Sequence, residues 1–284
     1  MPSFGTRVMA GLGRAQKHLL LALVPLTMAL MEIEKIQQIV AHHGMHVSFR
    51  VSFPSGVITL WTFVEGPTQG LTVDSIAPTV SPMALVLPGY IVIQAALTAG
   101  YFGSLADALE TGAYDFFANV RRYFVQFLVY TLLPMVLIAP LLVFDGQPLS
   151  SSLTLFFVLF IPIFFALTYL FYATPYLVVL RETDIISAAK GAYGLALDGG
   201  AFWRYTLGFV ALSLLASAFI SAFVVNLGLG GIIFGVLILS PVGLGLNFAT
   251  MHLIADIDPH SPSYGSWDAA DAGARSKSAD TNPN

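Results

Sequence analysis

The chain has 284 residues, of which 56% are hydrophobic and only 10% are charged, and its mean hydropathy is +0.79. This composition is far more apolar than that of a soluble domain and predicts an integral membrane protein. The net charge of -4 argues against a nucleic-acid-binding surface, and the absence of cysteine excludes disulfides, thiolate metal sites and cysteine nucleophiles.

The N-terminal part of the chain is first basic and then apolar. Residues 1–17 carry basic side chains and no acidic one, and an apolar stretch follows them. Helical spacing of apolar residues continues up to Gly44, so we expect a cytoplasmic N-terminus over residues 1–17 and a first transmembrane helix with an amphipathic extension over residues 18–44. A cleaved signal peptide has the same basic and apolar order, and an intact N-terminus on the mature protein would decide between the two.

A β pattern occurs in residues 45–81. Apolar and polar residues alternate over residues 46–53, a Pro-Ser-Gly turn follows at residues 54–56, and residues 57–64 are rich in β-branched and aromatic side chains. This order predicts a small extracytoplasmic β-hairpin followed by a loop. A lone hairpin is marginally stable in water, so we expect it to lie on the membrane, on the helices or against a partner.

Five further apolar runs predict transmembrane helices. The run over residues 153–180 contains no charged side chain and is long enough to cross a hydrocarbon core of about 30 Å. The other four are residues 83–103, 123–144, 205–226 and 231–254. With the first helix these runs predict an all-α polytopic bundle of six spans.

The basic residues indicate the orientation of this bundle. If the N-terminus is cytoplasmic, every Lys and Arg except Lys35 and Arg50 falls on the cytoplasmic side. Because cytoplasmic loops are enriched in Lys and Arg, we expect a multi-pass protein of the cell membrane with both termini in the cytoplasm.

Two cytoplasmic connections resemble each other. Residues 104–119 and 184–198 place apolar residues at helical spacing, each contains Gly-Ala-Tyr, and each leads to an Arg-Tyr pair. We expect two interfacial amphipathic helices and a parallel internal repeat within a five-helix membrane region over residues 82–257. Residues 258–284 have few apolar side chains and predict a disordered cytoplasmic tail.

Groups that carry chemistry are scarce in the predicted spans. Their central turns contain no Asp, Glu, Lys or Arg, and the chain has no phosphate-binding loop, nucleotide fingerprint or metalloprotease motif. We therefore expect no enzyme activity and no cofactor. His42, His43 and His46 are candidates for a metal site, but a polar helix end near the headgroups explains them more simply, so we expect no bound metal.

Small residues and prolines indicate how the spans pack. Four-residue intervals, which allow close helix packing in lipid, separate Ser213, Ser217 and Ser221 and also Gly231 and Gly235. Pro162 and Pro175 near the ends of one span predict kinks, which either shape the bundle or help to build a binding site. Gly243, Gly245, Asn247 and Thr250 form a polar stretch suited to lining a cavity.

One region also carries a family resemblance. Residues 172–181 (YATPYLVVLR), the helix over residues 184–198, and the pair Trp203 and Arg204 follow one another. This order is similar to uncharacterised prokaryotic six-helix membrane families, namely domain-of-unknown-function groups related to the glycerophosphodiester phosphodiesterase membrane domain and the YciC-like inner-membrane proteins. The resemblance covers residues 82–257 and departs at residues 45–81. It implies a fold and a membrane location, and it brings no catalytic residues.

Three hypotheses for function follow. The first is a non-enzymatic accessory or scaffold protein of the cell membrane, with a membrane-protein partner or a second copy of the chain bound beside the lipids, and with no nucleic acid. The second is a passive carrier or lipid-handling permease, which requires a cavity between kinked helices. The third is metal-dependent chemistry at the outer histidines, which requires bound metal.

Overall fold

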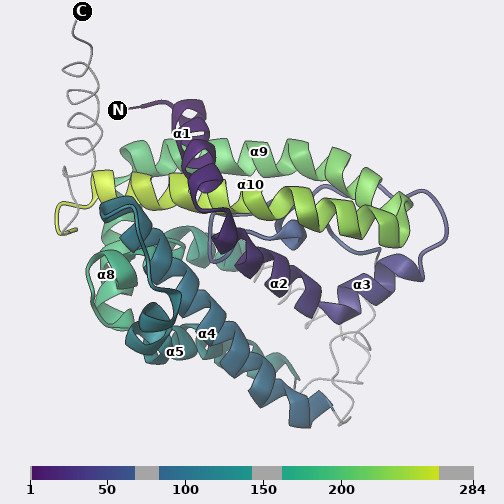
Figure 1. Cartoon of the computed structure of the whole chain (residues 1–284), viewed down its shortest axis with the longest axis horizontal. Helices are drawn as coiled ribbons and strands as arrows, with labels where there is room; N and C mark the ends of the chain where they lie inside the picture. Colours follow the sequence, from purple (N-terminus) through teal and green to yellow (C-terminus); the bar gives the residue numbers. More distant parts are fainter. Residues whose placement is uncertain (1, 68–82, 143–161, 262–284) are drawn as a thin grey trace, which may run out of the picture.

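The computed structural model describes residues 2–67, 83–142 and 162–261 (Figure 1). Every regular element in these ranges is a helix, and none of the described residues forms a strand. The elements are α1 (Phe4–Lys17), the 3₁₀ helix η1 (Leu19–Ala22), α2 (Leu23–Met31), α3 (Ile33–Val40), the 3₁₀ helix η2 (Leu60–Thr62), α4 (Met83–Glu110), α5 (Phe116–Leu142), a helix over residues 162–171, α7 (Thr174–Leu180), α8 (Ile185–Asp198), α9 (Gly200–Asn226) and α10 (Gly228–Ile257). The all-α prediction is confirmed for these residues.

Four of the described helical stretches are long and apolar enough to cross a membrane. They are Leu87–Glu110, Pro162–Leu180, Gly200–Asn226 and Gly228–Ile257. These stretches lie on four of the six predicted spans, which supports a transmembrane bundle. The predicted span 123–144 lies on α5 and ends outside the described residues, as does the first part of the span 153–180.

The predicted first span does not form one continuous helix. Residues 18–44 are divided into η1, α2 and α3, and the apolar stretch Leu19–Met31 is shorter than the four candidate spans. The interruption between α2 and α3 is at Glu32, whose backbone (φ -79°, ψ 59°) is not helical. The carboxylate of Glu32 accepts a hydrogen bond from Tyr90 on α4 and pairs with Lys35, so polar contacts hold the chain at this break.

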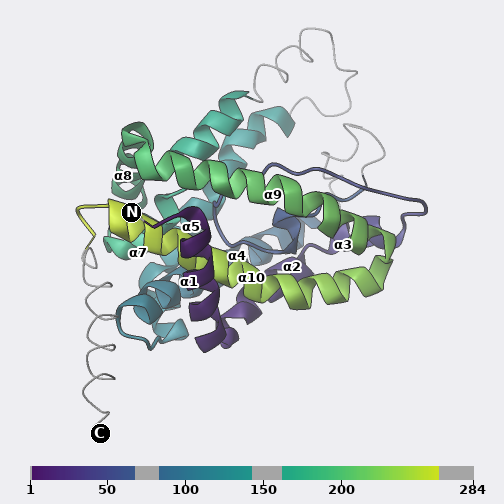
Figure 2. The same cartoon turned by 90° about the horizontal axis from the view of Figure 1, so that it is seen from above.

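α10 lies at the centre of the described bundle. It contacts α1, α2, α3, α4, α7 and α9, and nearly all its residues from Gly243 to Ala255 are buried. α9 and α10 run side by side and antiparallel (Figures 1 and 2), joined at Gly228, whose positive φ of 56° suits a residue without a side chain.

Residues 1–17, expected only as a cytoplasmic N-terminus, contain a packed helix. Ser3 caps α1 by accepting a hydrogen bond from the Thr6 amide, and α1 then crosses α10 (Figures 1 and 2). At the crossing, Gly11 lies so close to the Gly245 carbonyl that a side chain at residue 11 would clash. Small residues therefore allow these two helices to touch backbone to backbone.

Two arginines form ion pairs beside this crossing, and we call this part of the molecule the α1 end (Arg7, Arg181, Asp256 and Asp258). Arg7 is 3% exposed and donates to Asp256 at 2.6 Å. Arg181 makes two bonds to Asp258, of 2.9 Å from Nε and 2.6 Å from Nη2, and the Asp258 side chain is fully buried. Both pairs bind the C-terminal end of α10 to elements that precede it in the chain.

The two predicted interfacial helices differ in outcome. Residues 104–119 do not form a separate helix, because α4 continues to Glu110 and the chain then turns at Gly112 (φ 77°) before α5 begins. The second helix is present as α8, with Asp184 as its N-cap and Gly199 directly after it. Because only one copy has a separate helix, the described residues do not show the proposed internal repeat.

The predicted β-hairpin does not form. Residues 45–59 have no regular secondary structure, and η2 follows where the second strand was expected. Ile58, Leu60, Trp61, Phe63 and Val64 are each at most 4% exposed, so this part of the chain belongs to the core between helices rather than to an outer loop.

Candidate functional site

The most unusual feature of the bundle is a segment without α-helix, residues 45–64, whose second half is largely buried; we call it the inserted segment. It follows α3, runs along α9 (Figure 2), turns at residues 54–56 and returns through η2. In a lipid-like environment such a backbone needs hydrogen-bond partners from the protein itself. The partners of the inserted segment therefore explain why it is stable.

Side chains of α9 bind the first half of the inserted segment. Alternate backbone N–H groups donate to oxygens on α9, in the pairs His46 to Asn226 (2.8 Å), Ser48 to Ser221 (2.9 Å), Arg50 to Ser217 (2.9 Å) and Ser52 to Ser213 (3.1 Å). Two residues of extended chain advance about 6.7 Å. The three serines are four residues apart, which is about 6 Å of α-helix, and Asn226 follows Ser221 by five residues, or about 7.5 Å, so the two spacings match over this length. The serine hydroxyls of α9 thus accept the hydrogen bonds that a neighbouring β-strand would accept in a sheet, and we call this row of bonds the serine ladder.

The second half of the inserted segment is bound by Asn247 of α10, which is fully buried. Its Oδ1 accepts from the Ile58 amide and the Tyr101 hydroxyl, both at 3.0 Å. Its Nδ2 donates to the Gly56 carbonyl at 2.9 Å and the Tyr176 hydroxyl at 2.8 Å. All four hydrogen bonds that an amide side chain can make are therefore present.

Close packing supports this contact. The Ile58 carbonyl lies against Gly243 of α10, where any side chain would clash with it. The indole of Trp61 donates to the Ala29 carbonyl at 2.7 Å, which joins η2 to α2. Gly243 and Asn247, expected to line a cavity, instead hold the inserted segment.

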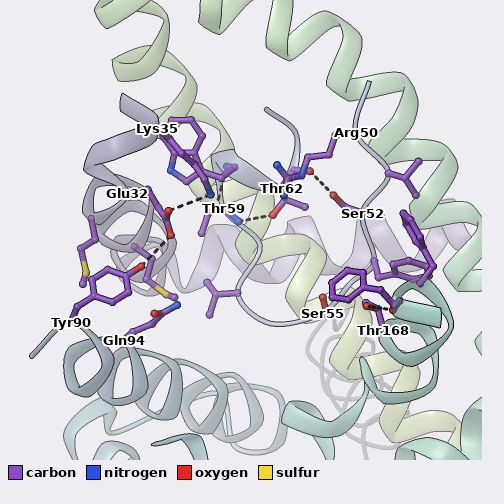
Figure 3. A pocket seen from close by; sticks show the side chains of 18 residues that line it. Glu32, Lys35, Arg50, Ser52, Ser55, Thr59, Thr62, Tyr90, Gln94 and Thr168 are labelled. Atoms are coloured by element: carbon purple, nitrogen blue, oxygen red, sulfur yellow. Dashed lines mark hydrogen bonds and ion pairs between the residues drawn. The ribbon is translucent and has the colours of Figure 1, made fainter. Parts of the chain in front are cut away.

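A cavity of about 360 Å³ lies beside the inserted segment (Figure 3). Its walls come from α2 and α3, the inserted segment, α4 and the helix over residues 162–171. Ten of its lining side chains carry polar groups: Glu32, Lys35, Arg50, Ser52, Ser55, Thr59, Thr62, Tyr90, Gln94 and Thr168. Ligand pockets typically measure about 300–1,000 Å³, so the cavity is large enough for a small molecule or a headgroup.

The charged groups of the cavity are paired but accessible. Lys35 Nζ lies 3.2 Å from a Glu32 oxygen, and both side chains are about one-third exposed. Arg50 Nη1 lies 2.9 Å from Glu65, whose side chain is 51% exposed. Exposed pairs of this kind contribute about 0–1 kcal/mol, so a ligand can exchange with them at low cost.

One side of the cavity is aromatic. Phe53 of the inserted segment lies 6.0 Å from Phe165, measured between ring centroids, and Phe164 beside it is 52% exposed. Phe164 and Phe165, which are neighbours on the helix over residues 162–171, both line the cavity. The cavity therefore joins a polar interior to an exposed apolar wall.

The histidines predicted as candidate metal ligands lie after α3. The rings of His42 and His46 meet edge to face with centroids 5.6 Å apart. In the described part of the chain no group of three His, Cys, Asp or Glu side chains is arranged to hold a metal ion. Among the described residues, His43 makes no ring contact with the other two, so the arrangement offers no metal centre of the usual kind.

The serines, glycines and prolines that were predicted to pack or kink the helices differ in what they contact. Ser213, Ser217 and Ser221 face the inserted segment, whereas Gly231 lies against the backbone of α9 at Val224. Gly235 is close to Val224 and to Leu60. For the prolines, Pro162 is the first described residue of a helix that is interrupted at residues 172–173, and Pro175 stands in the first turn of α7.

Some residues of the site were missed by sequence reasoning although a signal was present. Lys35 and Arg50 are the two cations that the charge rule left on the outer side, and both line the cavity. Because Lys and Arg are normally enriched on the cytoplasmic side, the position of these two residues on the outer side was a signal in the sequence that they belong to a site. Tyr101 and Tyr176 gave no such signal, because an aromatic residue in an apolar span is usually part of the core.

Comparison with protein-family models, with curated proteins and with solved structures finds no match. The fold and the site therefore define the class by themselves: a helical bundle with membrane-competent helices, an inserted segment without α-helix and a mixed polar and aromatic cavity. The resemblance to six-helix membrane families stays a prediction.

Proposed function

We propose that this protein is a multi-pass protein of the cell membrane that binds an amphiphilic molecule in its cavity, as a lipid-handling permease or passive carrier. The observation that carries this proposal is the cavity itself, which places charged and hydroxyl groups next to the exposed ring of Phe164. An amphiphile would place its polar part among the former and its apolar part against the latter. The distribution of Lys and Arg favours cytoplasmic termini.

Transbilayer movement of a fluorescent lipid in proteoliposomes tests the proposal. Thr168 lines the cavity, and among the described residues its hydroxyl bonds only to the Phe164 carbonyl of its own helix, so Thr168→Trp should fill space without breaking a described tertiary contact. Leu167→Trp is the matched control, because Leu167 is 39% exposed and does not line the cavity. We expect the wild type and the control to accelerate movement and Thr168→Trp to lose most of it. Equal rates in protein-free vesicles would contradict the proposal.

A second candidate is the accessory or scaffold role. The first half of the inserted segment exposes apolar side chains, with Met45 at 92%, Phe49 at 70% and Val47 at 53% exposed. Such a surface suits a membrane-protein partner or a second copy of the chain as well as lipid. Native mass spectrometry of the protein extracted gently from its membrane separates the two candidates: a stoichiometric protein partner favours the accessory role, and one retained lipid or solute favours the carrier.

A further inference from the structure

The charges around the cavity indicate which headgroup it takes; this step rests on the proposed function. Lys35 and Arg50 line the cavity with two positive charges and Glu32 lines it with one negative charge. Glu65 does not line the cavity but pairs with Arg50 and supplies the second negative charge. A ligand that carries a single charge would take one member of an ion pair and leave the other member without a counter-charge, at a cost in desolvation. A net-neutral set with both signs is matched best by a ligand that also carries both.

Arg50 is prepared to receive the anionic part. Its bonds to Glu65 and to the Val64 carbonyl both use Nη1. Nε and Nη2 make no bond to the described residues, and a guanidinium offers donors in a planar fork that fits carboxylate or phosphate oxygens. The hydroxyls of Ser52 and Thr62 lie near Arg50 in Figure 3.

Glu32 is prepared to receive the cationic part. One of its oxygens accepts from Tyr90 and the other pairs with Lys35, whose Nζ lies 5.7 Å from the centre of the Trp61 ring. The Lys35 ammonium thus lies between the Glu32 carboxylate and the Trp61 ring, an arrangement that is favourable for an ammonium group. In Figure 3, Glu32 and Tyr90 stand on one side of Thr59 and Thr62, and Arg50 stands on the other.

The size of the cavity and its aromatic wall complete the description. A volume of about 360 Å³ suits a headgroup with the first part of a chain rather than a whole two-chain lipid. An acyl chain would leave past Phe164 and Phe165, which are 52% and 38% exposed. We infer that the cavity binds the zwitterionic headgroup of a membrane amphiphile, with its phosphate or carboxylate at Arg50 and its ammonium at Glu32.

Trp61 lines the cavity and therefore reports on its contents. In the full-length protein with Trp203→Phe and Trp267→Phe, it is the remaining tryptophan. Its emission is titrated with four probes: lysophosphatidylethanolamine, lysophosphatidylglycerol and monoacylglycerol with one acyl chain in common, and chainless phosphoethanolamine. We expect the zwitterionic lipid to bind at least about tenfold more tightly than the other three probes, as a charged hydrogen bond at each end predicts.

Variants assign the two ends of the headgroup. Arg50→Gln and Glu32→Gln should each weaken binding of the zwitterionic lipid about tenfold, and Arg50→Lys should fall between wild type and Arg50→Gln because it keeps the charge and loses the fork. Arg122→Gln is the control, since Arg122 pairs with Glu182 away from the cavity and should leave binding unchanged. Thermal melting of each variant verifies that it is folded.

The remaining outcomes separate this inference from the proposed function. If the anionic or the uncharged lipid binds as tightly as the zwitterionic one and Glu32→Gln changes nothing, the headgroup assignment is wrong and the cavity still binds amphiphiles. If phosphoethanolamine binds as tightly as the lipid, the ligand is a free solute and the membrane source is wrong. If none of the probes changes Trp61 emission, both the inference and the proposed function fail.

Discussion

The α1 end and the cavity both contain arginines paired with carboxylates, yet the two sets of pairs are built differently. Asp258 is fully buried and makes two bonds to Arg181, whereas Glu65 is half exposed and bonds to one nitrogen of Arg50. A buried and geometrically saturated pair holds elements together, and losing one partner leaves an uncompensated charge. A half-exposed pair with spare donors contributes little to stability and is available to a ligand.

Breaking the buried pair should have the largest effect. Asp258→Asn removes the counter-charge of Arg181, so the free energy of unfolding should fall by about 3 kcal/mol. Chemical denaturation in detergent micelles measures it. Glu182→Gln is the control, because its pair with Arg122 is about half exposed on both sides and should contribute less than about 1 kcal/mol. If the two variants lower the free energy of unfolding equally, the buried pair at the α1 end is no more important for stability than an exposed pair.

Asn247→Leu should rank second. The change leaves the Ile58 amide and the Gly56 carbonyl without their partners, and each unsatisfied buried group costs about 1–3 kcal/mol. We expect a loss of at least about 2 kcal/mol in the same denaturation experiment, together with faster hydrogen exchange at Ile58. Exchange at Ile58 as slow as in the wild type would show that Asn247 does not hold the inserted segment.

A single serine of the ladder should have a smaller effect. Ser217→Ala removes the acceptor of the Arg50 amide, with an expected loss of about 1 kcal/mol. Ser240→Ala is the matched control, because the Ser240 hydroxyl donates only to the Val236 carbonyl of its own helix and should change stability little. If Ser240→Ala lowers the free energy of unfolding as much as Ser217→Ala does, the effect comes from replacing a serine in a helix and not from the hydrogen bond to the Arg50 amide.

Releasing Arg50 from its carboxylate should change binding more than stability. Glu65→Gln should lower the free energy of unfolding by less than about 1 kcal/mol. Because the anionic part of a zwitterionic ligand competes with Glu65 for Arg50, affinity for lysophosphatidylethanolamine should rise about threefold. Titration of Trp61 emission measures it, and a fall in affinity would mean that Glu65 itself contacts the ligand.

Asp184 gives the smallest effect, and it depends on pH. Its hydrogen bonds with Ser187, first from the side chain and then from the backbone, hold its pKa below the usual 3.8. A carboxylate with a lowered pKa stabilises the fold above pH 3.8, and this contribution is lost as pH falls through the folded pKa. Asp184→Ala should therefore melt at a lower temperature than the wild type at neutral pH, and the gap should narrow below pH 3.8. A gap that is constant down to pH 2 would exclude this role.

The sequence predicted those parts of the fold that depend on local pattern. The apolar runs located the membrane-competent helices, and Asp184 and Gly199 marked both ends of α8. The alternation at residues 46–53 was read as one strand of a hairpin, but the backbone of this part of the chain bonds to side chains of α9 and not to a second strand. The serines of α9 were read as a face for packing against another helix, so this contact was not predicted.

The site was less predictable because its contacts are distant in the chain. Asn247 is 189 residues from its partner Ile58, and nothing in the neighbourhood of either residue indicates the other. The break at Glu32 was similarly hidden, because α3 continues the helical spacing of α2 after one residue that is not helical. The sequence showed Lys35 and Arg50 as the two basic residues on the outer side, but only the fold shows that they line one cavity.

The inserted segment is synthesised long before the residues that accept its hydrogen bonds. Its backbone is made well before its partners, since Ser213 follows Ser52 by 161 residues and Asn247 follows Gly56 by 191. Until α9 and α10 are made, the amides of residues 46, 48, 50, 52 and 58 lack the side chains that accept their hydrogen bonds. We therefore expect the inserted segment to reach its final position only after α9 and α10 have been made, although it precedes them in the chain.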